Sequence, residues 1–233
     1  MSRREGFSTK ALALFSGGKD STLAICEAVQ SGIEVVGLLS IIPETEDSWM
    51  FHVPNVEWTH LQAKAMELPF HRFQVKGRKE EEVKELEEIL KKLKKEMEFD
   101  GVVSGAIDSV YQKSRIDAVC ERLRLKSISP LWRRDAKELL KKVISEGFEV
   151  YIVGVFAEGF DESWLGRRLD EKLVEKLVKL GEKYGIHLCG EGGEYETFVC
   201  DCPLFKRKIV IMEVEKLWRR SWGVLRVKKA ALI

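Results

Sequence analysis

Ser16-Gly17-Gly18-Lys19-Asp20-Ser21 follows an apolar run, Ala11–Phe15, and precedes a segment of helical periodicity. This order predicts a strand, a tight turn and a helix. Two adjacent glycines let the backbone approach an anion closely, and the start of a helix adds unpaired N–H groups and the positive end of its dipole. The charge of Lys19 and the hydroxyls of Ser16 and Ser21 complete a turn that we expect to bind a polyphosphate.

This turn differs from the commoner nucleotide loop, which places a glycine five residues before its Gly-Lys pair, where this chain has Ala13. All six positions instead match Ser-Gly-Gly-x-Asp-Ser. The turn therefore resembles the pyrophosphatase loop of enzymes that split ATP between its α and β phosphates and adenylate a substrate. The resemblance implies that residues 16–21 bind ATP, that Lys19 and Asp20 are catalytic, and that Asp20 orients the loop or helps to hold Mg2+.

Composition sets limits on the function. The chain has 233 residues, 45% of them hydrophobic and 33% charged, with a formal net charge of +1, so it can bury a large core and its charge gives no reason to expect nucleic acid. No apolar run approaches the ~18 residues that span a bilayer, and no secretory signal is visible. We therefore expect a cytoplasmic protein without a membrane partner, and its five cysteines to be reduced thiols.

Strands and helices alternate in the first half of the sequence. This alternation predicts an α/β fold, with a parallel sheet that helices cover on both faces and a ligand at the carboxyl ends of the strands. The expected strands are Ala11–Phe15, Val35–Ile41, Phe70–Val75 and Gly101–Ile107. The expected helices are Asp20–Gln30, Val56–Glu67 with Asn55 as N-cap, Glu80–Glu98 and Ser109–Leu125.

The last hundred residues differ in kind. A break at Ser129-Pro130 precedes a capping box that opens with Asp135, followed by an apolar strand, Val150–Phe156, and a helix, Asp170–Tyr184. Two β-rich runs near the end, Lys208–Val214 and Trp222–Val227, predict a hairpin. We expect an ATP-binding domain over residues 1–130 and a smaller α+β substrate-binding domain over residues 131–233.

A second strand end with little side-chain bulk is Ser104-Gly105-Ala106. Its backbone is expected to hold the adenosine or α-phosphate side of ATP, with Leu39 also in the nucleotide site. The alternative is that small residues simply close the turn into the next helix. In that helix Asp108, Tyr111 and Arg115 share one face at spacings of three and four, and we assign them to the substrate, although a solvated helix start would also explain Asp108.

The third candidate is the segment Gly190-Glu191-Gly192-Gly193-Glu194-Tyr195-Glu196-Thr197. Three carboxylates within six residues repel one another, so they need positive charge nearby. Three glycines free the backbone to wrap around a ligand. A solvated acidic loop remains the alternative, but we interpret residues 191–197 as a substrate-binding loop whose natural partner is a cation.

Several blocks together resemble the diphthine–ammonia ligase family. They are Ser104-Gly105-Ala106-Ile107, Tyr111-Gln112, Arg115, Val119-Cys120, Pro130-Leu131-Trp132 and Glu191–Thr197, with the turn at residues 16–21. The resemblance implies a five-stranded sheet of the adenine nucleotide alpha hydrolase-like (HUP) type. It also implies that the chain amidates diphthine on translation elongation factor 2, using ATP, Mg2+ and ammonium and releasing AMP and pyrophosphate.

Diphthine carries a trimethylammonium group, which donates no hydrogen bonds and binds best to aromatic faces and negative charge. One hypothesis is that Glu191, Glu194, Tyr195 and Glu196 bind this cation, with a tryptophan such as Trp132 or Trp164. The competing hypothesis makes Glu194 catalytic, capturing ammonium and removing its proton.

Two other functions and the assembly state stay open. One is a tRNA-modifying enzyme with the same loop, although the chain has no Cys-x-x-Cys pair; the other is a regulatory module that binds ATP without turnover. A homodimer is also left open. The histidines, which show no metal-ligand spacing, are interpreted as structural or surface residues: His52, His60, His71 and His187.

Overall fold

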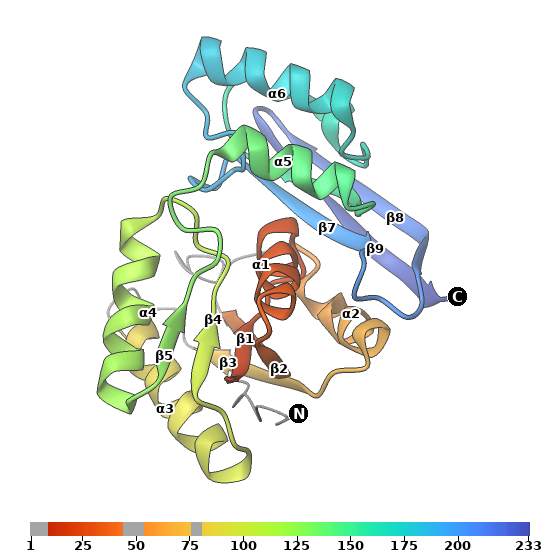
Figure 1. Ribbon diagram of the computed structural model, residues 1–233. Helices are drawn as coiled ribbons and strands as arrows, with labels where there is room; N and C mark the ends of the chain where they lie inside the picture. The colour runs from red at the N-terminus through yellow and green to blue at the C-terminus, as the bar shows by residue number, and fades with distance from the viewer. Residues whose placement is uncertain (1–8, 44–53, 76–80) are drawn as a thin grey trace, which may run out of the picture.

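The computed structural model describes residues 9–43, 54–75 and 81–233. The larger of its two sheets has five parallel strands in the order β3-β2-β1-β4-β5 (Figure 1). These strands are β1 Lys10–Leu14, β2 Glu34–Pro43, β3 Phe70–Val75, β4 Gly101–Val103 and β5 Lys126–Ile128. The helices between them are α1 Lys19–Gln30, α2 Thr59–Met66, α3 Glu82–Glu96 and α4 Val110–Leu123, with a short 3-10 helix, η1 Val56–Trp58, before α2. The predicted parallel α/β sheet is thus confirmed.

Two strands differ from expectation. The edge strand β5 was not anticipated, because three residues with one apolar side chain facing the core carry no periodic signal. Strand β4 ends at Val103 instead of Ile107, since the chain turns away once the Ser104 N–H has bonded to the carbonyl of Ile128. The expected start of the third helix at Glu80 lies outside the described residues.

Each face of the larger sheet has its own helices. Helices α3 and α4 cover one face, where Leu90 and Val119 pack against Leu12 and Leu39. Helices α1 and α2 cover the other face, where the small side chains of β1, such as Ala13, let α1 approach closely. The sheet is therefore buried on both sides, as its unbroken apolar strands predict.

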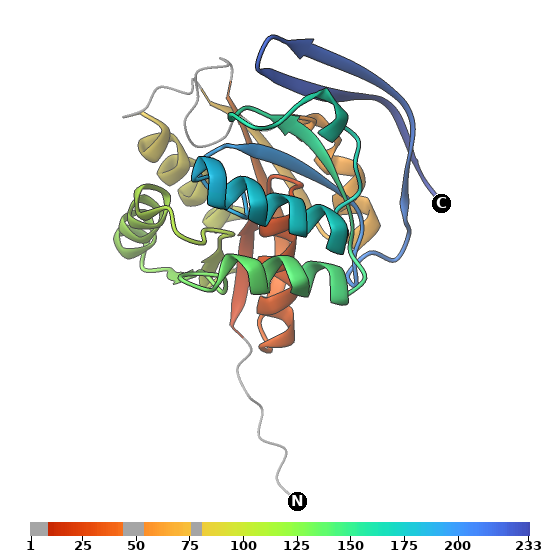
Figure 2. The same cartoon turned by 90° about the horizontal axis from the view of Figure 1, so that it is seen from above.

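The smaller sheet has four strands in the order β7-β6-β9-β8, and every adjacent pair is antiparallel. Its elements are α5 Ala136–Ser145, β6 Glu149–Val155, η2 Glu162–Trp164, α6 Glu171–Tyr184, β7 Tyr195–Asp201, β8 Ile209–Arg219 and β9 Trp222–Leu232. Asp135 caps α5 by accepting the N–H of Glu138, as the capping box predicts. The predicted hairpin is β8–β9, and it lies along the outer edge of the molecule (Figure 2).

Helix α1 lies between the two sheets, so one continuous core joins them. Asn55 adds to this junction instead of capping a helix: its side chain donates to the carbonyl of Leu225 and accepts the N–H of Val227, both on β9, while its backbone is left-handed (φ 65°). Asn55 does stand at the expected N-cap position, before η1, but its side chain makes no cap bond because the amide is bound to the other sheet. The division at about residue 130 stays a prediction. None of the helices in the described part of the chain is long and apolar enough to span a membrane.

Candidate functional site

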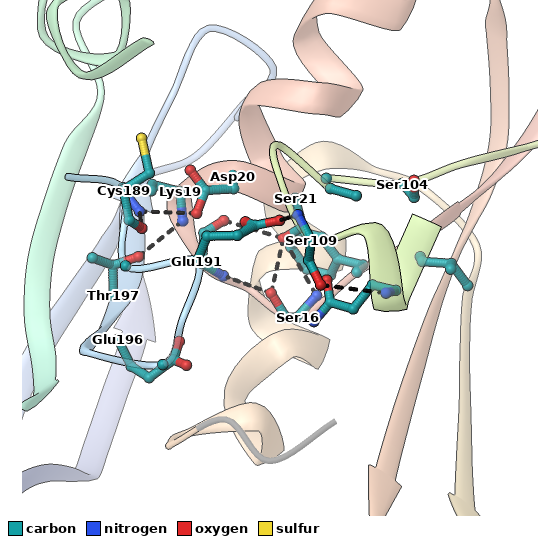
Figure 3. Close-up of a pocket in the computed structure, with 18 of the residues that line it drawn as sticks. Ser16, Lys19, Asp20, Ser21, Ser104, Ser109, Cys189, Glu191, Glu196 and Thr197 are labelled. Atoms are coloured by element: carbon teal, nitrogen blue, oxygen red, sulfur yellow. Dashed lines mark hydrogen bonds and ion pairs between the residues drawn. The ribbon is translucent and has the colours of Figure 1, made fainter. Parts of the chain in front are cut away.

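A cavity of about 690 Å³ opens at the carboxyl ends of β1, β2 and β4, where they meet the start of β7 (Figure 3). It brings together most of the residues that the sequence singled out. Those lining it are Ser16, Gly18, Lys19, Asp20, Ser21, Leu39, Ser104, Gly105, Ala106, Tyr111, Glu191, Gly192, Gly193, Tyr195, Glu196 and Thr197. Four of the predicted residues do not line it: Gly17, Asp108, Arg115 and Glu194.

The two serines of the turn at residues 16–21 bond to each other. The Ser16 and Ser21 hydroxyls lie 3.1 Å apart, and Ser21 Oγ also donates to the carbonyl of Gly18. Ser21 Oγ accepts the backbone N–H of Ser16 at 3.3 Å as well. The hydroxyls therefore shape the turn, in addition to facing the cavity.

The turn is also bonded to β7 of the smaller sheet. The backbone N–H of Lys19 donates to Thr197 Oγ1 at 3.0 Å, which gives the first turn of α1 the cap that Gly18 cannot supply. The Val199 N–H donates to the carbonyl of Gly17 at 3.1 Å. The buried Gln62 donates at 2.8 Å to the carbonyls of both Gly17 and Val199. A single glutamine in a helix carries no sequence signal for such a role.

Lys19 is buried, with 1% of its surface exposed. Its ammonium donates to Asp20 Oδ2 at 2.8 Å and to the carbonyl of Cys189, and it lies 4.9 Å from the ring centre of Tyr195. Burial lowers the pKa of Lys19, but the Asp20 carboxylate and its other neighbours raise that pKa by more, so the side chain stays charged. The positive charge therefore lies beneath the turn and between the sheets.

Two of the three carboxylates in the segment at residues 190–197 are bound by backbone. Glu191 Oε1 accepts the N–H groups of Ile107, Asp108 and Ser109 at 3.0, 3.2 and 2.9 Å, which fastens the segment to the start of α4. Glu194 accepts the N–H groups of His187 and Gly192 at 2.7 and 2.8 Å. Their negative charge is stabilised by the chain's own donors, so neither needs a bound cation.

The third carboxylate, Glu196, is different. It lines the cavity, and no hydrogen bond or ion pair joins its carboxylate to another residue in the part of the chain that the structure describes. Burial raises the pKa of Glu196 to about 8, opposed by Lys19 and reinforced by Asp20, Glu194 and Glu191. Tyr195, Glu196 and Thr197 belong to β7, so the predicted loop ends at Glu194.

Tyr195 and the two tryptophans do not fit the predicted cation site. Tyr195 is 2% exposed, and its hydroxyl donates to the carbonyl of Leu188 at 2.6 Å. Trp164 is buried against Phe160, and Trp132 packs beside Arg133 and Lys113 outside the cavity lining. Tyr195 therefore lines the cavity with its hydroxyl already bound, while the two tryptophans lie outside the cavity lining.

A histidine connects the segment at residues 190–197 to α4. His187 Nδ1 accepts the N–H groups of Cys189 and Glu191, which leaves the proton on Nε2, 3.1 Å from Asp108 Oδ2. Arg115 stacks on Tyr111, 3.4 Å from its ring centre. Asp108 and Arg115 thus stand beside the cavity and hold its wall, while His52 lies outside the described residues.

The strand end at residues 104–106 has a packing reason for its small side chains. A Cβ on Gly105 would lie 2.8 Å from the backbone nitrogen of Ser21, so only glycine lets this turn approach α1. Ser104 Oγ lies 2.9 Å from Ser129 Oγ. Close packing and an approaching nucleotide are compatible here, because both need a bare backbone.

Other parts of the cavity wall were missed by the sequence analysis. One side is apolar and comes from the ends of β1 and β2, from η1 and from α4: Leu14, Phe15, Ile41, Val56 and Ile116. Gln112, quoted above only as part of a block of resemblance, also lines the cavity; the other polar additions are Ser109 and Cys189, and an exposed aromatic, Phe156, follows β6. They gave no signal because each is an ordinary residue type for its element.

Asp20 is the ligand that the sequence analysis predicted for Mg2+. Asp20 lines the cavity and uses only Oδ2 for Lys19 among the described residues, which leaves its second oxygen for a metal or water. No group of three His, Cys, Asp or Glu side chains suited to a metal occurs in residues 9–43, 54–75 and 81–233. One carboxylate is what Mg2+ needs when substrate phosphates and water complete its coordination, so the residues fit such an ion.

Comparison with known proteins identifies relatives over most of the chain. Residues 9–127 match the family model described as diphthamide synthase N-terminal domain, and residues 135–233 match the model described as diphthamide synthase C-terminal domain. The diphthine–ammonia ligase of Homo sapiens is 38% identical over 221 residues, covering 87% of this chain and 82% of that protein. The diphthine–ammonia ligase of Danio rerio is 40% identical over 224 residues, covering 88% of each.

Among solved structures, a predicted subunit of tRNA methyltransferase from Methanocaldococcus jannaschii resembles the chain at a TM-score of 0.46 and 19% identity. The match covers 84% of this chain and 98% of that one. This likeness is too distant to bear on function.

Proposed function

The chain belongs to the diphthamide synthase family, and from this premise we propose that it is a ligase that amidates diphthine on translation elongation factor 2 at the expense of ATP. The observation that carries the proposal is the bonding of the turn at residues 16–21 to β7. The Lys19 N–H bond to Thr197 and the Val199 N–H bond to Gly17 bring the turn and Glu196 to one cavity, which supports the proposal that the turn binds phosphate beside this carboxylate.

The proposed reaction has two steps. A carboxylate oxygen of diphthine attacks the α-phosphorus of ATP, the bond to the bridging β-phosphate oxygen breaks, and pyrophosphate leaves. Ammonia then attacks the carbonyl carbon of the acyl-adenylate, the bond to the AMP oxygen breaks, and one proton is lost. The products are AMP, pyrophosphate and the amide.

The turn at residues 16–21 is proposed to bind the leaving pyrophosphate. Backbone N–H groups at the start of α1 and the dipole of this helix stabilise negative charge as it develops, and the buried Lys19 charge lies directly behind them. Mg2+, when bound, would neutralise charge on the phosphates, and Asp20 is the residue that would hold it. These groups act more strongly on the transition state than on ATP itself.

The rest of ATP is assigned to the opposite wall. Leu39 and its apolar neighbours at the ends of β1 and β2 suit the faces of a purine, while the bare backbone at residues 104–106 suits the ribose and α-phosphate.

The roles of the acidic residues are revised. Because Glu194 and Glu191 bind backbone N–H groups, we assign them to holding the cavity wall, as positioning residues. The sequence analysis gave Glu194 two alternative roles, contact with a cationic substrate and capture of ammonium. Of the glutamates that it assigned to the cation, we keep this contact for Glu196, which lines the cavity and accepts no backbone N–H from the described residues.

The alternatives lose support at this site. Cys189 lines the cavity, but burial raises the pKa of its thiol to about 12, which disfavours the thiolate that sulfur transfer to tRNA requires. A regulatory module without turnover would bind ATP and form no products.

The test incubates the protein with diphthine-bearing elongation factor 2, ATP, Mg2+ and ammonium. We expect a mass change of the factor that corresponds to amidation, and one AMP and one pyrophosphate per amide by chromatography. Formation of ADP and phosphate would contradict the adenylation step, and ATP binding without any product would favour the regulatory module.

A further inference from the structure

Two exposed aromatic side chains stack at the rim of the cavity. Phe156, which follows β6, and Trp222, which begins β9, have ring centres 6.2 Å apart and planes 25° apart. Their exposed fractions are 38% and 39%, and Phe156 lines the cavity. Apolar rings that remain in water beside a binding cavity suggest a surface that a ligand covers.

The backbone fixes the position of this pair. The Phe156 N–H donates to the carbonyl of Glu194 at 2.9 Å. On the other side, β6 and β9 pair through Val155 and Gly223, which brings Trp222 opposite Phe156. The two rings are therefore held by the same sheet that presents Glu196.

Gly154 brings the rings close to Glu196. It pairs with Glu196 across β6 and β7. A Cβ at Gly154 would lie 2.8 Å from the Phe156 ring and 3.3 Å from the Glu196 Cβ, so the ring and the glutamate side chain both lie against this bare backbone. The Phe156 ring and the base of the Glu196 side chain thus share one corner of the cavity.

Glu196 is the residue of this corner whose charge the chain leaves uncompensated. Glu191 and Glu194 receive backbone N–H groups, and Lys19 is bound to Asp20. No side-chain cation in the described ranges forms an ion pair with Glu196, and burial has already raised its pKa to about 8. A cationic ligand would stabilise the charged form of Glu196.

On the basis of the proposed function, we propose that Phe156, Trp222 and Glu196 form a subsite for the trimethylammonium group of diphthine. A quaternary ammonium donates no hydrogen bonds, so it gains most from aromatic faces and a nearby carboxylate, which is the composition of this corner. A primary ammonium would instead need several hydrogen-bond acceptors to replace its water. The subsite selects trimethylated substrate and anchors it while its carboxylate faces ATP.

The kinetic test compares F156L and W222L with the wild type, and uses F73L as a matched control on β3, where Phe73 lies beside Lys92 outside the cavity. We expect F156L and W222L to raise KM for diphthine-bearing elongation factor 2 by about tenfold, with KM for ATP and ammonium and kcat within about twofold of the wild type. F73L should leave all three KM values unchanged. Unchanged KM for the factor in both rim variants would overturn the subsite, while AMP formation by the wild type would still support the proposed function.

A binding test works without turnover. Choline and 3,3-dimethylbutan-1-ol have the same shape and differ in charge, so each is titrated into the protein while tryptophan fluorescence is followed. We expect saturable binding of choline, about tenfold weaker binding of the alcohol, and loss of this preference in E196Q. Equal affinity for the two probes in the wild type would overturn the subsite, even if the protein formed no AMP. Thermal melts of each variant confirm that it is folded.

Discussion

The turn at residues 16–21 and the segment at residues 190–197 line one cavity, yet they hold their polar groups in different ways. The turn satisfies its serines internally, and its function can be inferred from six consecutive residues. In the acidic segment, Glu191 and Glu194 accept backbone N–H groups, and Glu196 lines the cavity without such a partner among the described residues. Three carboxylates that look equivalent in the sequence therefore have different roles, because their hydrogen-bond partners differ.

The largest effect is expected at Lys19, which belongs to the turn and whose N–H bonds to Thr197 of the acidic segment. Lys19→Met would leave Asp20 without its buried partner, so we expect a loss of about 3 kcal/mol in the free energy of unfolding and at least a hundredfold loss of kcat. Urea denaturation and AMP formation measure the two effects. Lys91→Met, which removes the ion pair of an exposed lysine with Glu87, is the matched control and should leave the free energy of unfolding nearly unchanged. Equal losses in both variants would contradict the role of the buried charge.

The next largest effect is expected at Glu191 of the acidic segment. Glu191→Ala leaves three N–H groups at the start of α4 without an acceptor, and we expect it to lower stability by about 2 kcal/mol. Glu191→Gln keeps one acceptor oxygen and should recover about half of the loss. If both variants were as stable as the wild type, Glu191 would be free to bind substrate, and its assignment as a positioning residue would fail.

A smaller effect is expected from Thr197→Val, which removes the acceptor of the Lys19 N–H while keeping the shape of the side chain. We expect a loss of about 1 kcal/mol and a higher KM for ATP, because the first turn of α1 loses its cap. Thr197→Ser keeps the oxygen and should restore KM. A serine variant that behaves like the valine variant would show that packing, and not the cap, determines the effect.

The last expected effect concerns Glu196 and depends on pH. Because the pKa of Glu196 is raised to about 8, the folded protein retains a proton that the unfolded chain loses above about pH 4.5. Its burial therefore makes the wild type less stable as pH rises from about 5 to 8. Glu196→Gln should match the melting temperature of the wild type at about pH 4 and exceed it by an amount that grows as pH rises to about 8. Parallel curves for the two proteins would contradict an uncompensated carboxylate.

The sequence analysis succeeded where the signal is local. The parallel sheet, the hairpin and the Asp135 cap each follow from patterns within a few residues, and the structure contains all three. The partners of the acidic residues lie elsewhere: Glu191 bonds to residues more than 80 positions away, and Asn55 bonds to β9 about 170 positions away. Such pairings depend on how the two sheets dock, which no local pattern encodes.

The aromatic residues of the proposed cation subsite could not be predicted for the same reason, since they are far apart in the sequence. Phe156 and Trp222 are ordinary strand-end aromatics until the β6–β9 pairing brings them together, and Gly154 has meaning only beside the Phe156 ring. Tyr195 and a tryptophan such as Trp132 or Trp164 were predicted to contact the cation, but Tyr195 and Trp164 are buried in the core.

The position of α1 between the two sheets has a consequence for how the molecule comes apart. The first N–H of this helix is accepted by a threonine of the smaller sheet, and the ammonium of Lys19 is bound to the carbonyl of Cys189. If the smaller sheet melted first, it would leave an uncapped helix and a lysine with half of its partners lost. The two sheets should therefore unfold in one cooperative transition and protect the amide hydrogens of β1 and β7 from exchange to a similar degree.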